Sequence, residues 1–314
     1  MTSLVASAPG KVVLSGEYAV LDGAPAISMA VNRRAVVVCA PVSGDEATLK
    51  SVGLAGDTDR RLYDCTVRAT QFEQADDCSF VLDTSAFVDV DSGAKFGIGS
   101  SAALTVALGR ALAPKKASDG DVGAIAAIAH RDFQRGTGSG VDIATSVAGG
   151  LIEFHLSDAR VTRLTWPTGL NFALLWSGVA ASTRDRVDRL RASEAKPSRK
   201  ILSGVAATTA TAWQSGSAAA VIAAYVEYID ALMSFSIDHG LGIFEAGHDT
   251  LVQDANADGL VYKPCGAGGG DVGIALATDS AQLNAFVEHA AESGFRHLDF
   301  DIDMTGVQIT RDHE

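Results

Sequence analysis

Basic residues are scarce in this chain of 314 residues. Its 25 lysines and arginines stand against 38 aspartates and glutamates, which gives a formal net charge of −13. A protein that binds a nucleic-acid backbone or an anionic membrane surface needs a broad positive field. The composition therefore argues against nucleic acid and against a membrane as partners.

Cysteine and long apolar runs are also in short supply. The four cysteines show no C-x-x-C spacing and are too few for a secreted disulfide framework, so we expect reduced thiols and a cytoplasmic location. Apolar windows such as residues 36–42 and 218–225 are well short of the roughly 20 residues of a membrane helix. Neither a signal-peptide pattern nor a zinc-binding histidine pair is present. The sequence thus predicts a soluble protein without zinc.

Hydrophobic residues make up 47% of the chain, enough for a large core. The length suggests two domains, and a break in pattern near Trp166 divides residues 1–165 from residues 166–314. Short β-branched runs predict strands, and tracts with apolar residues three and four apart predict helices. We expect strands at 5–7, 12–14, 26–29, 34–40, 172–176, 272–277 and 306–310, and helices at 100–112, 121–131, 198–214, 217–239, 244–255 and 280–293, with a mixed helix-then-strand segment at 145–154.

Glycine is abundant, with 32 residues, and one glycine-rich run opens a predicted helix. In Lys95-Phe-Gly-Ile-Gly-Ser-Ser-Ala-Ala103 the glycines let the backbone approach an anion closely. The unpaired N–H groups of the following helix favour a phosphate there, and the serines are suited to cap it. The run predicts a phosphate cradle; a packing role for a glycine-rich helix start is the alternative.

Two further glycine runs and one lysine are candidates for the same site. Asp142 follows a flexible turn and would accept a proton or hold a metal, but it would equally serve as a helix N-cap. The dense glycines of residues 266–270 favour close approach to a ligand or another backbone. Cys265 beside them is interpreted as a packing residue. Lys11, in a strand that otherwise looks buried, predicts an anionic partner; a solvated edge lysine is the alternative.

Three segments, APGKVVLSGEYAVL, KFGIGSSAAL and KPCGAGGGDVGIAL, resemble in order the three motifs of the GHMP small-molecule kinases. Finer details, including Tyr18 after the glutamate of the first motif and Asp271 closing the third, look most like the bacterial phosphomevalonate kinases. The resemblance implies an α+β fold of two-layer α/β type. Its N-terminal half would be like ribosomal protein S5 domain 2 and its C-terminal half ferredoxin-like, with the active site in the cleft between them.

Carried over residue by residue, the resemblance also implies roles at the site. Catalysis would rest on Lys11 and Asp142, and Mg²⁺ would be held by Ser101 and Asp142. The ATP phosphates would be wrapped by Lys95, Gly97, Ile98, Gly99, Ser100, Ser101 and Ala102, and the acceptor would be bound by Lys11, Tyr18, Ser139, Ser182 and Gly268.

The implied reaction is transfer of the γ-phosphoryl group of MgATP to 5-phosphomevalonate, in isoprenoid biosynthesis, by a monomer or homodimer. A mevalonate kinase is the first alternative, and the decarboxylase of mevalonate diphosphate is a weaker one because its first motif departs from that around Lys11. A nucleotide sensor that kept the fold but lost catalysis would not need Lys11, Ser101 and Asp142 together. Cys265 stands where phosphomevalonate kinases often carry serine.

Overall fold

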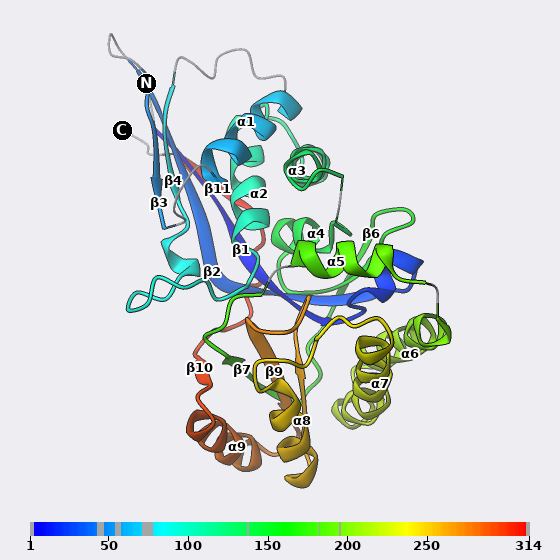
Figure 1. Ribbon diagram of the computed structural model, residues 1–314. Helices are drawn as coiled ribbons and strands as arrows, with labels where there is room; N and C mark the ends of the chain where they lie inside the picture. Colours follow the sequence, from blue (N-terminus) through cyan, green and yellow to red (C-terminus); the bar gives the residue numbers. More distant parts are fainter. Residues whose placement is uncertain are drawn as a thin grey trace.

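The computed structural model describes residues 3–42, 47–53, 58–70, 78–136, 138–181, 183–194 and 196–311. It has two sheets, each covered by helices (Figure 1). The first sheet has the order β11-β1-β2-β4-β3, with β5 paired to β2 and β6 paired to β5. Its described strands are β1 (Leu4–Ser15), β2 (Ala26–Pro41), β3 (Leu49–Val52), β4 (Cys78–Asp83), β5 (Leu151–His155), β6 (Arg160–Leu164) and β11 (Gln308–Arg311).

The long hairpin of β1 and β2 forms the centre of this sheet. The segments predicted at 5–7 and 12–14 belong to one strand, because β1 continues through an irregularity in register between Pro9 and Gly10. The predicted strands at 26–29 and 34–40 are likewise parts of β2. Pairing with a neighbouring strand extends both beyond the limits that local pattern indicates.

Helices α1 (Thr58–Thr70), α2 (Ser100–Leu112), α3 (Asp119–Phe133) and α4 (Val141–Ala148) lie together on one side of the first sheet (Figure 1). The bounds predicted for α2 are confirmed. Its run from Ala102 to Gly109 is buried throughout, because α2 packs against β1, β2 and the three other helices. A central helix buried on all sides holds its first turn in a fixed position.

The second sheet has the order β10-β7-β9-β8, from strands β10 (Arg296–Leu298), β7 (Asn171–Trp176), β9 (Val272–Ala277) and β8 (Val261–Pro264). Helices α8 (His248–Ala257) and α9 (Ser280–Glu292) pack on it. The remaining helices among the described residues are α5 (Thr183–Ala192), α6 (Pro197–Gln214), α7 (Ala218–Asp238) and the short 3₁₀ helices η1 (Ala19–Asp22) and η3 (Ser85–Phe87). The last strand, β11, returns to the first sheet beside β1.

One helix begins later than predicted, and one apolar stretch is longer than expected. The helix expected from residue 244 begins at His248, because Ala246 and Gly247 have φ values of 59° and 83°, which an α-helix does not allow. The apolar stretch of α7 is longer than the window expected at 218–225: by length and composition alone, this helix is long and apolar enough to cross a membrane. Tyr225, Tyr228 and Phe235 are nevertheless buried in the core of this chain, so packing accounts for much of its apolar character.

Candidate functional site

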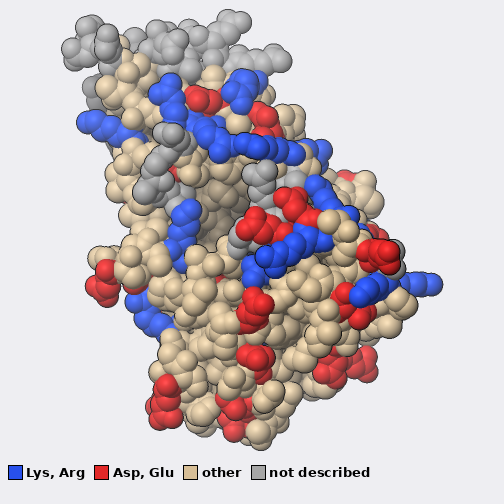
Figure 2. Space-filling view, viewed as in Figure 1, with Lys and Arg blue, Asp and Glu red and all other residues tan. Residues whose placement is uncertain are grey.

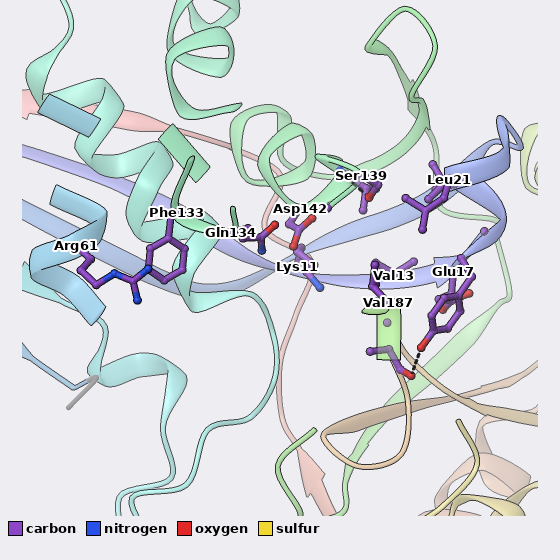
Figure 3. A pocket seen from close by; sticks show the side chains of 18 residues that line it. Lys11, Val13, Glu17, Leu21, Arg61, Phe133, Gln134, Ser139, Asp142 and Val187 are labelled. Atoms are coloured by element: carbon purple, nitrogen blue, oxygen red, sulfur yellow. Dashed lines mark hydrogen bonds between the residues drawn. The ribbon is translucent and has the colours of Figure 1, made fainter. Parts of the chain in front are cut away.

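The three glycine-containing motifs, far apart in the sequence, meet at one place. The backbone N–H of Lys11 donates to the carbonyl of Ile98 over 2.8 Å. The side chain of Asp271 packs directly on Gly97. The hydroxyl of Tyr18 donates to the carbonyl of Ala267 over 2.7 Å, the bond drawn in Figure 3. Each motif therefore touches another through hydrogen bonds or van der Waals contact.

The run from Lys95 to Ala103 has the backbone geometry of an anion-binding loop. Gly97 and Gly99 have φ values of 80° and 82°, which favour glycine. The expected serine cap is wrong: Gly99 is the N-cap of α2, and it makes no side-chain capping bond among the described residues. The first N–H groups of α2 consequently keep their capacity to bind an anion.

The other residues of this loop differ in their environment. The side chain of Lys95 is exposed, and its carbonyl accepts a bond of 3.2 Å from the indole of Trp176 in the second sheet. Ile98 and Ala102 are buried, so their backbone is what remains to contact a ligand. Ser100 and Ser101 form the first turn of α2. The loop is thus held between both sheets.

Ser101 has a partner that the sequence did not indicate. Its Oγ lies 3.2 Å from Nε2 of His130 on α3. Burial lowers the pKa of His130; the charge of Asp142 opposes this effect and that of Lys11 adds to it. These interactions place His130 near both residues predicted to be catalytic. No sequence spacing distinguishes His130 from the other histidines, and only the packing of α3 on α2 brings it here.

A cavity of about 370 Å³ opens around Lys11 (Figure 3). None of residues 95–103 is among its lining residues; the loop adjoins it through Lys11, whose side chain packs on Gly99. Lys11 and Asp142 lie in its middle, between an end formed by Arg61 and Phe133 and an end formed by Glu17 and Leu21. Most lining residues are apolar or glycine: Val13, Gly16, Tyr18, Val20, Leu21, Ala26, Phe133, Gly138, Val141, Val187, Gly266 and Ala267. The polar ones are Lys11, Glu17, Arg61, Gln134, Ser139 and Asp142. A few polar groups in an apolar cavity are typical of small-molecule sites.

Asp142 is not the helix N-cap that the sequence left open. Gly140 caps α4, and Asp142 follows in the first turn with its side chain in the cavity. Burial would raise the pKa of Asp142, but the charges of Lys11 and His130 outweigh it and lower the pKa. The carboxylate is therefore ionised at neutral pH beside the Lys11 ammonium.

The residues expected at the acceptor lie in different places. Tyr18 and Ser139 line the cavity. Gly266 and Ala267 also line it, whereas Gly268 packs so closely on Ile243 that an added Cβ would lie 2.5 Å from the Ile243 carbonyl oxygen. Ser182 lies outside the described residues.

Sequence analysis missed the Arg61 end of the cavity. The guanidinium of Arg61 on α1 lies 5.0 Å from the centre of the Phe133 ring on α3. Lysine and arginine side chains gather over α1 and α5, on both sides of a hollow, although the chain as a whole is acidic (Figure 2). Helix α1 was not predicted, so its basic face was not assigned to the site.

A metal site made by protein ligands alone is not present among the described residues, where no three His, Cys, Asp or Glu side chains cluster. Mg²⁺ usually takes one or two protein ligands, together with phosphate oxygens and water. A hydroxyl at Ser101 and a carboxylate at Asp142 fit a metal ion that arrives with a nucleotide. Cys265 is buried and unpaired, and burial raises its pKa to about 11, which suits a packing role.

The chain is similar to known kinases over most of its length. Residues 68–150 match the model of the GHMP kinases N terminal domain. A phosphomevalonate kinase of Streptomyces sp. (strain CL190) is 30% identical, covering 87% of this chain and 90% of that protein. A Homo sapiens mevalonate kinase is 27% identical over 98% of this chain and 94% of its own.

The structural comparison shows the fold. The Streptococcus pneumoniae phosphomevalonate kinase in complex with phosphomevalonate and AMPPNP has a TM-score of 0.81 at 20% sequence identity, over 95% of this chain and 99% of that one. This likeness confirms the predicted α+β fold with its two-domain arrangement. The three motifs that contact one another and the relatives that share the length of the chain lead to one conclusion: this protein belongs to the GHMP kinases and is a phosphotransferase.

Proposed function

We propose that this enzyme transfers the γ-phosphoryl group of MgATP to 5-phosphomevalonate, giving mevalonate 5-diphosphate and ADP. The observation that carries the proposal is the position of Lys11: its side chain lines the apolar cavity together with Asp142, and it also packs on Gly99 of the 95–103 loop. The loop would hold the ATP phosphates through backbone N–H groups, and the Glu17 end of the cavity would hold the acceptor. Phosphoryl transfer needs mainly positioning and charge stabilisation, and these groups would supply both.

The state of Asp142 supports a phosphate acceptor. A phosphate monoester is already ionised at neutral pH, so its attack needs no strong base, whereas an alcohol must lose a proton. The lowered pKa of Asp142 makes it a poor base. Asp142 would then act by orienting the Lys11 ammonium, which would stabilise charge on the transferred group.

Mg²⁺ would be held by Ser101 and Asp142 together with the nucleotide. When bound, the ion neutralises charge on the phosphate oxygens. His130, which contacts Ser101 Oγ, would orient that hydroxyl. In this arrangement the side chains of α2, α3 and α4 converge on the same phosphates.

Mevalonate kinase is the second candidate, because relatives with that name match the chain as well. One from Methanothermobacter thermautotrophicus is 38% identical over 50% of this chain and 52% of its own. A mevalonate kinase and a phosphomevalonate kinase would present similar ATP loops, so the Glu17 end of the cavity would decide between them.

The test is a coupled assay that measures ADP release. Mevalonate, 5-phosphomevalonate and mevalonate diphosphate are each supplied separately as the acceptor. We expect the enzyme to prefer 5-phosphomevalonate over mevalonate by at least about a hundredfold in kcat/KM, the scale of a missing charged contact. A preference for mevalonate would refute the proposal in favour of the second candidate. The absence of ADP release with all three would favour the nucleotide sensor. The Asp142→Asn variant, prepared identically, controls for a contaminating kinase.

A further inference from the structure

A buried ion pair lies beside the acceptor end of the cavity. Nζ of Lys263 on β8 lies 2.5 Å from Oε1 of Glu17, and the side chains are 0% and 2% exposed respectively. Glu17 lies in the turn that follows β1 of the first sheet, whereas Lys263 is in the second sheet, 246 positions away in sequence. Glu17 lines the cavity, on the same side as Leu21 (Figure 3).

The second oxygen of Glu17 is also satisfied. Its Oε2 accepts a bond of 2.6 Å from the hydroxyl of Tyr228 on α7. The same hydroxyl accepts a bond of 2.7 Å from the backbone N–H of Gly16. The next tyrosine on this face of α7, Tyr225, donates to the carbonyl of Leu14 over 2.8 Å. The turn that carries Glu17 and Tyr18 is therefore tied to α7 and to β8.

Stability does not by itself explain the ion pair. Two charges removed from water lose hydration free energy that their attraction barely offsets. A pair of apolar residues of similar size often stabilises a protein as much as a buried ion pair does. The position of the pair is more informative. Glu17 is a carboxylate beside a cavity whose proposed occupant is anionic, and an unpaired carboxylate there would repel that occupant.

We propose that Lys263 is a positioning residue for the acceptor: it neutralises Glu17, so that an anionic acceptor can bind beside a carboxylate. The inference rests on the proposed function and extends it to the C-terminal sheet. Lys263 does not line the cavity and acts through Glu17. The acceptor KM should then follow the net charge of the pair and not its packing.

The experiment measures the acceptor KM, with 5-phosphomevalonate as the acceptor, and the ATP KM for the wild type, Lys263→Met, Glu17→Gln and the double variant. Lys263→Met leaves one negative charge, so the acceptor KM should rise at least about tenfold. Glu17→Gln removes that charge, and its acceptor KM should not exceed the wild-type value. The double variant is neutral again, and its acceptor KM should return to within about threefold of wild type. The ATP KM should change little in all three.

Arg34→Met is the matched control, because it breaks another ion pair between residues far apart in the sequence, with Asp303 at 2.5 Å, and Arg34 does not line the cavity. It should leave the acceptor KM unchanged. If Lys263→Met does not fold, Glu17→Gln and the double variant still decide. If the acceptor KM of either variant rises more than about tenfold, the ion pair contributes only through packing, and the inference is overturned.

The two proposals fail in different ways. If wild-type enzyme does not use 5-phosphomevalonate, the proposed function is wrong before any variant is made. The series is then run with mevalonate, whose carboxylate is also anionic. An acceptor KM that ignores the charge of the Glu17–Lys263 pair overturns the inference whichever acceptor is used.

Discussion

Replacing Gly97 by alanine tests the contact between the phosphate loop and the third motif. An added Cβ would lie 2.2 Å from Cγ of Asp271, much closer than two carbon atoms can approach. Asp271 has little freedom to move away, because its N–H donates to the carbonyl of Val179 over 2.7 Å and its Oδ1 accepts from Ala181 N–H over 3.2 Å. The loop itself must therefore shift.

Gly93 provides a control that separates backbone strain from this clash. Its φ is 69°, similar to the 80° of Gly97, but an added Cβ at Gly93 meets nothing within 4 Å. Alanine in the left-handed region costs about 1–2 kcal/mol at either position. Overpacking adds about 1–3 kcal/mol at Gly97 alone. The free energy of unfolding of Gly97→Ala should thus be lower than that of Gly93→Ala by the overpacking term of about 1–3 kcal/mol.

Urea unfolding of both variants measures that difference, and steady-state kinetics measure its effect on nucleotide binding. Because each 1.4 kcal/mol is about tenfold in affinity, a displaced loop should raise the ATP KM of Gly97→Ala about tenfold or more. Gly93→Ala should keep the wild-type ATP KM. Equal unfolding free energies and equal ATP KM values for the two variants would refute the packing of Asp271 on the loop.

Three further changes test the charged groups. Asp142→Asn should leave ATP binding within about a few-fold but lower kcat at least about a hundredfold in the ADP-release assay; near-normal turnover would make Asp142 structural. Lys11→Met should lower kcat strongly with little change in ATP KM, whereas a raised acceptor KM with intact kcat would limit Lys11 to binding the ground state. Burial lowers the pKa of His248 to about 4 in the folded protein. Between about pH 6.5 and pH 4 the imidazole is therefore protonated in the unfolded chain but neutral in the folded one, so the free energy of unfolding should fall as the pH drops through this range. At pH 5 the loss of unfolding free energy is about 2 kcal/mol. In urea unfolding at several pH values, the unfolding free energy of His248→Gln should fall less steeply with decreasing pH than that of the wild type; the same pH dependence in both would contradict the assignment.

Local sequence was enough to predict α2, α3, α6, α7 and α9 and the glycine motifs, but not α1 or α5. Helix α2 begins and ends where its apolar spacing indicates, since a helix is stabilised by contacts between residues three and four apart. Strands such as β3 and β6 were missed, because each is only four or five residues long and depends on its neighbours in the sheet. The capping of α2 by Gly99 depends on backbone angles that residue type alone does not specify.

Motif order in the sequence was sufficient to identify the family and a phosphotransferase, because anion-binding loops need glycine at particular points and few other residues supply a positive φ. The tertiary structure decided which residues share the cavity. His130 beside Ser101, Arg61 beside Phe133, and Lys263 against Glu17 join segments far apart in the chain. Such contacts arise from the packing of helices and sheets against each other, and no periodicity or spacing in a single sequence records them.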